Sequence, residues 1–192
     1  IACSLVAAKL GIPVAHLEAG LRSFDWSMPE EINRVLTDRL SDILLTPSAD
    51  GDENLMKEGI PKSKIFRVGN IMIDTLFRLL PQAKQSPILR ELKLTAGDYI
   101  LGTFHRPSNV DTEAALGELT EIILDASRFG TFVLPLHPRT RKMLAQFRYS
   151  ARLEQNPAVR LIDRLGYIEC RALTSQAKAV LTDSGGLQEE TT

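Results

Sequence analysis

Histidine and arginine stand together at two places in this chain of 192 residues, as His105-Arg106 and as His137-Pro138-Arg139. Neighbouring imidazole and guanidinium groups bind phosphate oxygens through charge-assisted hydrogen bonds, and they need no metal ion to do so. A single pair of this kind is often an ordinary feature of a loop. Because both pairs directly follow apolar runs, we expect His105, Arg106 and His137 to lie together and to contact a phosphorylated ligand.

A glycine-rich segment near the end of the sequence indicates the same ligand. Ser184-Gly185-Gly186 lies between an apolar run and an acidic stretch that includes Glu190. A glycine turn between a strand and a helix exposes backbone N–H groups at the positive end of the helix dipole, which attracts phosphate. We expect this turn to bind phosphate and the helix to begin near Gln188. Glu190 can accept hydrogen bonds from a ribose diol, although the dipole alone favours acids there.

Acidic residues in the first part of the chain are the candidate proton-transfer groups. Glu18 ends a short apolar run and leads into a loop that contains Arg22. A carboxylate at that place either pairs with Arg22 or has a pKa tuned by burial for acid–base chemistry. Glu30 and Glu31 begin an expected helix, where the dipole also favours acids. Asp38, later in that helix, is expected on a solvated face or in a structural ion pair.

Composition and missing motifs exclude several functions. The net charge of −1 gives no electrostatic footprint for nucleic acid or an anionic membrane, and no apolar run approaches the ~20 residues of a membrane span. There is no G-x-G-x-x-G fingerprint, no P-loop and no cluster with metal-ligand spacing, so we expect neither a nicotinamide nor a metal cofactor. Cys3 and Cys170 are expected to be free, buried thiols.

Strands and helices are expected to alternate along the chain. Short apolar runs predict strands at 13–17, 43–46, 65–68, 99–103, 132–136, 159–162 and 179–182. Amphipathic or capped segments predict helices at 1–10, 29–40, 49–58, 71–84, 112–128, 139–147 and 167–176, with Asp111 as one N-cap. This alternation is typical of an α/β fold with parallel sheets. Ligands bind such sheets beyond the carboxyl ends of the strands, where the candidate residues fall.

The same pattern predicts a division of the chain into two parts. Prolines and polar residues interrupt it in the segment 71–98, which we interpret as a linker with connecting helices. We therefore expect residues 1–70 to be the C-terminal portion of one domain and residues 99–192 to be the N-terminal portion of a second domain. The sequence starts with Ile and ends inside an expected helix, so we expect truncation at both ends.

Several motifs together resemble those of the non-hydrolysing UDP-N-acetylglucosamine 2-epimerases. The resemblance runs the length of the chain and consists of His16-Leu17-Glu18-Ala19-Gly20-Leu21-Arg22-Ser23, Pro29-Glu30-Glu31-Ile32-Asn33-Arg34, Gly69-Asn70, His105-Arg106, His137-Pro138 and Asp183-Ser184-Gly185-Gly186-Leu187-Gln188-Glu189-Glu190. It implies a glycosyltransferase B-type fold, in which two Rossmann-like domains bind the substrate in the cleft between them.

The family interconverts UDP-N-acetylglucosamine and UDP-N-acetylmannosamine. By position, Glu18 and Glu30 match the catalytic carboxylates of the family. His105, Ser184 and Glu190 match contacts to UDP. His137 matches a strand end that faces the nucleotide, and Arg22 lies within a signature loop.

The resemblance also sets expectations for the whole protein. It implies a homodimer, and with no targeting signal we expect a cytoplasmic location. The chain holds about half of a family member, so by itself we expect it to be inactive. Many bacterial members read His-Arg-Arg-Glu where this chain reads His105-Arg106-Pro107-Ser108-Asn109. The missing Glu puts allosteric activation by a second substrate molecule in doubt and leaves a related UDP-sugar open.

Two other functions fit the same sequence. A UDP-sugar-dependent glycosyltransferase would use the same nucleotide half but pass the sugar to an acceptor. A non-catalytic UDP-sugar-binding module would bind without turnover. The Glu18 loop and the Glu30 helix favour the epimerase.

Overall fold

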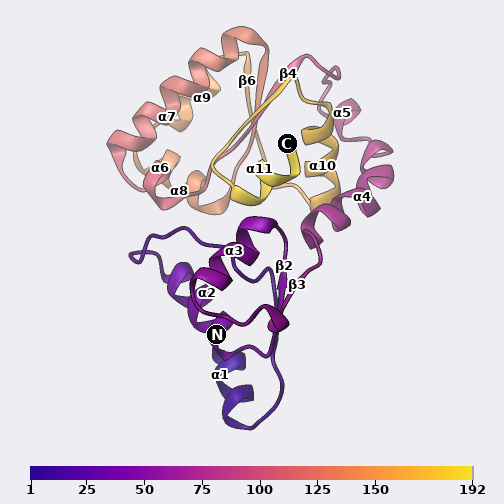
Figure 1. Ribbon diagram of the computed structural model, residues 1–192. Coiled ribbons are helices and arrows are strands. Elements are labelled where there is room, and N and C mark those ends of the chain that lie inside the picture. Colours follow the sequence, from indigo (N-terminus) through magenta and orange to yellow (C-terminus); the bar gives the residue numbers. More distant parts are fainter. Residues whose placement is uncertain (192) are drawn as a thin grey trace. The chain divides into compact units, whose positions relative to one another are not determined.

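The computed structural model describes residues 1–191 and contains two compact units (Figure 1). The N-terminal unit runs from Ile1 to Asp74, and the C-terminal unit begins at Thr75. Helix α4 (Ile71–Lys84) contains the boundary and lies in the segment expected as linker. The assignment of 1–70 and 99–192 to two domains of a longer chain stays a prediction.

The N-terminal unit has a three-stranded parallel sheet in the order β1-β2-β3. The register places Leu17 of β1 opposite Leu45 of β2. Helices follow or precede each strand, as an all-parallel sheet requires. The elements are α1 (Ala2–Lys9), β1 (Ala15–Leu17), α2 (Pro29–Leu40), β2 (Ile43–Thr46), α3 (Ala49–Lys57), a 3₁₀ turn (Lys62–Lys64) and β3 (Ile65–Arg67).

Helix α2 begins at Pro29 because proline fits the first helical position, where no N–H is needed. Glu30 and Glu31 occupy its first turn and complement the positive end of the helix dipole. Its last turn carries Asp38, which is fully buried, so Asp38 does not lie on a solvated face. Helix α2 therefore presents carboxylates at both of its ends.

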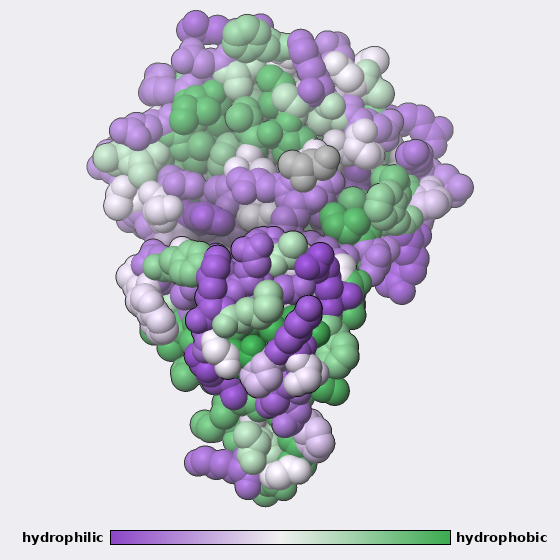
Figure 2. All heavy atoms as spheres, viewed as in Figure 1, coloured by the Kyte–Doolittle hydropathy of each residue, from purple (hydrophilic) through white to green (hydrophobic). Residues whose placement is uncertain are grey.

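The apolar core of the N-terminal unit is small. Its buried members are Ala19, Leu44 and Leu55, with two partly buried isoleucines packed against them. Helix α1 has no buried residue, and Figure 2 shows its apolar side chains in green at the end of the unit where Figure 1 places α1. Cys3 on α1 is exposed, so the expectation of a buried thiol was wrong for this residue, because α1 packs no face into a core.

The loop after β1 passes very close to helix α3. Gly20 has a left-handed backbone with φ +81°, and a Cβ built on it would lie 2.3 Å from the carbonyl oxygen of Gly51. Gly51 is less constrained, since a Cβ there would lie 3.2 Å from the carbonyl oxygen of Ala19. Only glycine therefore fits at position 20, for its conformation and for its space.

The C-terminal unit has a four-stranded parallel sheet in the order β6-β5-β4-β7. The strands are β4 (Tyr99–Thr103), β5 (Thr131–Pro135), β6 (Val159–Ile162) and β7 (Ala179–Thr182). The chain moves from β4 through β5 to β6 and then returns to the other side of β4. The strand order thus reverses between β4 and β7, and such a switch point opens a crevice at the carboxyl ends of the strands.

Helices cover both faces of this sheet (Figure 1). Ile100 packs into one apolar cluster, whereas its neighbours Tyr99 and Leu101 pack into the other, because successive side chains of a strand point to opposite faces. The helices are α5 (Ile88–Glu91), α6 (Pro107–Val110), α7 (Glu113–Ala126), α8 (Pro138–Gln146), α9 (Ser150–Glu154), α10 (Tyr167–Gln176) and α11 (Gly185–Thr191), with a 3₁₀ turn at Ser127–Phe129.

Two local expectations in this unit were wrong. Thr112, not Asp111, caps α7, because its side chain accepts a hydrogen bond from the N–H of Ala115. Helix α11 begins at Gly185 rather than near Gln188, because the hydroxyl of Ser184 accepts a hydrogen bond from the N–H of Leu187 and starts the helix earlier. The glycines expected in a turn are therefore helical.

Residues 1–191 contain neither a candidate membrane span nor a candidate metal cluster. No helix in this range has the length and apolar character to cross a bilayer. No group of three or more His, Cys, Asp or Glu side chains in this range is arranged to hold a metal ion.

The Gly20–Gly51 approach generates a stability prediction. Gly20→Ala adds a steric clash with backbone to an unfavourable left-handed alanine, and should lower the free energy of unfolding by about 3 kcal/mol. Gly59→Ala is the matched control, because Gly59 has φ +82° but a Cβ there meets nothing within 4 Å. The control should cost only about 1 kcal/mol. Urea denaturation of the intact gene product measures both, and equal costs would contradict the close approach.

Candidate functional site

Asp183 joins the ends of strands β4 and β7 in the C-terminal unit. Its carboxylate accepts hydrogen bonds from the backbone N–H of His105 at 3.0 Å and of Arg106 at 2.9 Å. The side-chain amide of Asn109 donates to the same carboxylate at 3.1 Å. Asp183 is nearly buried, with its side chain 7% exposed. It therefore fixes the loop that carries His105 and Arg106 at the switch point of the sheet.

His105 and His137 lie together at the ends of neighbouring strands. Their ring centroids are 5.4 Å apart and their planes are inclined by 39°. The Nδ1 atom of His105 is 3.2 Å from Asp183 Oδ1, and the N–H of Arg139 donates to His137 Nδ1 at 3.3 Å. The Nδ1 atom of His137 is thus an acceptor, and in the neutral ring Nε2 carries the proton and can donate to a ligand.

The surroundings of His137 disfavour its protonated form. Partial burial lowers its pKa below the ordinary value, and the positive charges of His105, Arg164 and Arg139 lower it further against the opposing effect of Asp183. Such an accumulation of positive groups is relieved when an anion binds among them. The site therefore has the electrostatic character expected for a phosphate ligand.

Two adjoining pockets border these histidines. A pocket of about 310 Å³ is lined by His105, His137 and Arg164, among others. A second pocket of about 300 Å³ is lined by Ser184, Gly186 and Glu190. Both are also lined by Thr103, His105, Tyr167, Cys170 and Arg171, so they form one concave surface. A larger hollow of about 500 Å³ lies along α4 and β7 and has neither histidine in its lining.

Arg164 is a member of the site that the sequence analysis missed. It lies two residues beyond the end of β6, at the same edge of the sheet as the two histidines. The rule that polar residues beyond parallel strands face the ligand would have found it.

The start of helix α11 lies beside Arg106. No hydrogen bond among the described residues uses the N–H groups of Gly185 and Gly186, as is usual for the first turn of a helix. The guanidinium of Arg106 lies near this turn, with its Nη2 atom 3.8 Å from where a Cβ of Gly185 would be. The turn and Arg106 together offer positive groups to one anion.

Glu190 is held by two residues of α10. Its carboxylate forms an ion pair with Arg171 and accepts a hydrogen bond from the hydroxyl of Tyr167 at 3.1 Å. Arg171 is nearly buried and its guanidinium carbon lies 5.1 Å from the centre of the Tyr167 ring. A ribose diol would share the Glu190 carboxylate with these partners, so its contact with ribose stays a prediction.

Glu18 lies directly after β1 in the N-terminal unit. Its backbone is left-handed, with φ +65°, which is uncommon for a residue other than glycine. Within residues 1–191 its carboxylate has neither a hydrogen-bond donor nor an ion-pair partner, and in particular Arg22 does not pair with it. Of the two interpretations of Glu18, the structural pair with Arg22 was therefore wrong.

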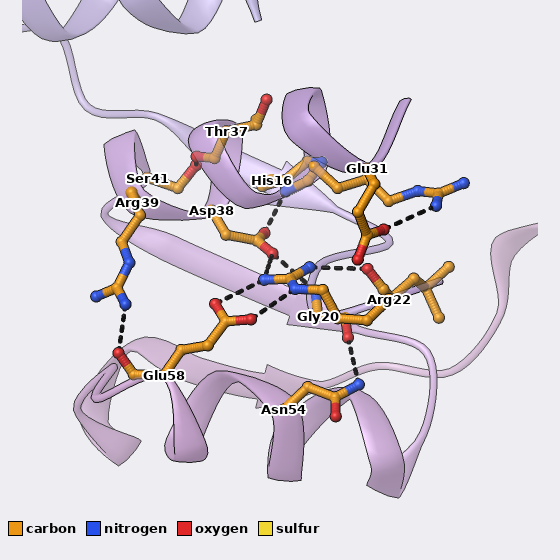
Figure 3. A network of polar contacts seen from close by, with 12 residues as sticks. His16, Gly20, Arg22, Glu31, Thr37, Asp38, Arg39, Ser41, Asn54 and Glu58 are labelled. Atoms are coloured by element: carbon orange, nitrogen blue, oxygen red, sulfur yellow. Dashed lines mark hydrogen bonds and ion pairs between the residues drawn. The ribbon is translucent and has the colours of Figure 1, made fainter. Parts of the chain in front are cut away.

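Arg22 instead belongs to a buried network of charges (Figure 3). Its Nη2 atom lies 2.7 Å from Asp38 Oδ2, and its Nε atom lies 2.6 Å from Glu58 Oε1. Burial alone would lower the pKa of Arg22, but the hydrogen bonds and charges of Glu58 and Asp38 raise it overall. The side chain is 1% exposed, so Arg22 holds the loop in place, and its expected contact with substrate stays a prediction that this arrangement does not favour.

Glu30 and Glu31 differ sharply in their surroundings. Glu30 is exposed in the first turn of α2, and no partner of its carboxylate occurs in the described part of the chain. Glu31 is buried and accepts hydrogen bonds from the N–H of Ser23 at 2.9 Å and of Phe24 at 3.0 Å. Burial would raise the pKa of Glu31, but these hydrogen bonds lower it overall. Glu30 is thus the reactive candidate and Glu31 a structural residue.

Comparisons with known proteins match this arrangement to one family. The family model described as UDP-N-acetylglucosamine 2-epimerase matches residues 1–192. The chain is 45% identical over 192 residues to a UDP-N-acetylglucosamine 2-epimerase homolog of Methanococcus maripaludis, covering 99% of this chain and 53% of that protein. It is 43% identical to the UDP-2,3-diacetamido-2,3-dideoxy-D-glucuronate 2-epimerase of Pseudomonas aeruginosa, covering 99% and 52%.

A solved structure agrees with these relatives. The UDP-GlcNAc 2-epimerase of Methanocaldococcus jannaschii in complex with UDP-GlcNAc and UDP has a TM-score of 0.86 and 43% identity, covering 97% of this chain and 52% of that chain. The chain spans about half the length of the curated relatives it matches. Because the family model covers every residue and the fold agrees, the chain belongs to the UDP-N-acetylglucosamine 2-epimerase family.

Proposed function

We propose that the intact gene product interconverts UDP-N-acetylglucosamine and UDP-N-acetylmannosamine by inverting C2 of the sugar. The observation that carries this proposal is the state of Glu18 in the structure. It is a carboxylate without a partner among residues 1–191, and its left-handed backbone is held by a buried network. A reactive group needs this combination of an unpaired functional atom and a fixed position.

The chemistry at C2 explains why the protein would need both UDP contacts and carboxylates. The C2 hydrogen is not next to a carbonyl group, so direct deprotonation is prohibitive. When the bond between C1 and the UDP oxygen breaks, its electron pair leaves with UDP, and the cationic centre at C1 acidifies the C2 hydrogen. A carboxylate takes that proton and the C2–H electrons form a C1–C2 double bond, which gives a glycal and UDP. Protonation of C2 from the opposite face and return of UDP to C1 complete the epimerisation.

Each unit has a separate part in this reaction. We assign proton transfer and stabilisation of the cation to Glu18 and Glu30. The diphosphate is assigned to His105, His137, Arg106, Ser184 and the N–H groups of Gly185 and Gly186, whose electrostatics favour an anion. Donors placed at the diphosphate stabilise the charge that develops on the leaving group. The homodimer and cytoplasmic location implied by the resemblance are part of this proposal.

Proton NMR of the intact gene product with UDP-N-acetylglucosamine in D₂O tests the function. We expect the C2 proton signal to disappear while a manno product grows. Since the relatives are about twice as long, the 192-residue chain alone should give no turnover. If no exchange occurs, the same assay with a diacetamido-glucuronate UDP-sugar and with sugar acceptors separates a different substrate, a transferase and a binding module.

Glu18→Gln keeps the size of the side chain but removes its basicity. In the intact gene product it should lower kcat by ~10²-fold or more, because general acid–base catalysis contributes about that much. The dissociation constant for UDP should stay nearly unchanged, since the UDP groups lie on other residues. Rates of C2 exchange and calorimetric titration with UDP measure the two quantities. Unchanged turnover would remove Glu18 from the mechanism.

His105→Ala tests the diphosphate site. Losing a charge-assisted hydrogen bond of about 1.5–3 kcal/mol should weaken UDP binding by roughly tenfold or more. Arg152→Ala is the control, because Arg152 is an exposed cation of the same unit that pairs with Glu121 and lines neither pocket at the histidines. Calorimetry with UDP compares both variants. Equal affinities for wild type and His105→Ala would exclude His105 from the site.

A further inference from the structure

We propose that Asp38 is the positioning residue of Glu18, an inference that rests on the proposed function of Glu18. The side chain of Asp38 is fully buried in the last turn of α2. It does not belong to the candidate catalytic or phosphate groups, and its sequence position gave no sign of a role at the site. Its contacts assign it to the loop that carries Glu18.

Asp38 contacts His16 and Gly20 (Figure 3), which lie on either side of Glu18 in the sequence. Its Oδ1 atom lies 2.5 Å from Nδ1 of His16, which is two residues before Glu18. Its Oδ2 atom accepts a hydrogen bond from the N–H of Gly20 at 3.2 Å, two residues after Glu18, and pairs with Arg22 at 2.7 Å. One carboxylate therefore fixes three points of a seven-residue stretch that has Glu18 near its centre.

The backbone conformation of Glu18 explains why contacts on both sides of it are needed. A left-handed conformation is unfavourable for a residue with a Cβ, and it persists where the surrounding structure over-determines it. No hydrogen bond or ion pair of the Glu18 side chain within the described chain holds that conformation, so the polar contacts of its neighbours must impose it. The contacts of Asp38 with His16 and Gly20 do so from either side.

Helix α2 also ties the other end of the loop. Glu31, in its first turn, binds the N–H groups of Ser23 and Phe24, and Phe24 is again left-handed with φ +58°. Glu30 sits beside Glu31 in that turn. Residues at the two ends of helix α2 therefore fix the position of the Glu18 loop relative to Glu30. Asp38, in the last turn, is the residue that fixes the part of the loop around Glu18.

A purely structural role for Asp38 would have different consequences from a positioning role. If Asp38 only stabilises the unit, its loss lowers the melting temperature but leaves folded molecules fully active. If it positions Glu18, folded molecules turn over slowly, because a displacement of about 1 Å in a reacting group can cost 10²-fold in rate. Substrate and UDP affinity should then change little, because the UDP contacts are on other residues.

The test uses Asp38→Asn in the intact gene product. We expect kcat to fall by about 10- to 100-fold, with KM and the dissociation constant for UDP each within about threefold of wild type. Asp52→Asn is the matched control, because Asp52 is a mostly buried carboxylate of the same unit that pairs with Arg67 at 2.6 Å and with Thr46, and its carboxylate forms no hydrogen bond or ion pair with the Glu18 loop in the described chain. The control should lose stability and keep kcat.

A double variant separates this inference from the proposed function. If Asp38 acts through Glu18, Asp38→Asn should cause little further loss of turnover in a Glu18→Gln background, since the effects of coupled residues are not additive. If Glu18→Gln turns over slowly but Asp38→Asn is folded and fully active, the inference is overturned and the proposed function stands. A fully active Glu18→Gln would overturn the proposed function itself. Additive losses would also overturn the inference.

His16 provides a second arm if Asp38→Asn does not fold. His16→Ala removes the contact before Glu18 and leaves Arg22 paired with Asp38, so it should lower kcat several-fold without changing UDP binding. His16→Asn places an amide donor close to the position of the imidazole Nδ1 and should restore turnover. Full activity of His16→Ala would overturn the proposed positioning role of Asp38. A failure of His16→Asn to restore turnover would overturn it as well.

Discussion

The buried ion pair between Arg22 and Asp38 is the interaction on which the N-terminal unit depends. Both side chains are withdrawn from water, and the apolar core beside them has only a few members. Removing one partner of such a pair leaves an uncompensated charge and typically costs 3–5 kcal/mol. Arg22 also contacts Glu58, and Asp38 also contacts His16 and the N–H of Gly20, so both charges are hydrogen-bonded. Buried polar contacts therefore contribute to the order of this unit beside its apolar core.

Both units use a buried carboxylate to arrange the chain at a strand end. Asp38 receives the N–H of Gly20 after β1, and Asp183 receives the N–H groups of His105 and Arg106 after β4. In each case the carboxylate satisfies the backbone of the loop, whereas a neighbouring side chain stays available for chemistry. A charged acceptor makes stronger hydrogen bonds to backbone N–H than a neutral one, so the loop is fixed without a ligand. The candidate site is in this sense pre-organised.

The sequence predicted the helices and strands more accurately than it predicted the contacts between side chains. Apolar runs located the strands of residues 1–191, and amphipathic or capped segments located the long helices, because both signals are local in the sequence. The short helices α6 and α9 have no such signal, and the start of α11 depended on one hydroxyl cap of Ser184. Arg22 was expected at the substrate because the sequence cannot show that Asp38 and Glu58, 16 and 36 positions away, neutralise it. Pairing between charges that are distant in the sequence leaves no local pattern, so the role of Asp38 became visible only in the three-dimensional structure.

The contact between Gly20 and Gly51 limits how this unit can diverge. Surface positions of α2 and α3 can exchange residues independently, since their side chains end in solvent. Positions 20 and 51 cannot, because a Cβ at either one meets the backbone of the other segment. A side chain at position 51 would have to shift the helix slightly away from the loop, and that shift would lengthen the hydrogen bond that Asn54 donates to the carbonyl of Gly20. Sequence drift in α3 is thus coupled to the shape of a loop 31 positions earlier in the chain.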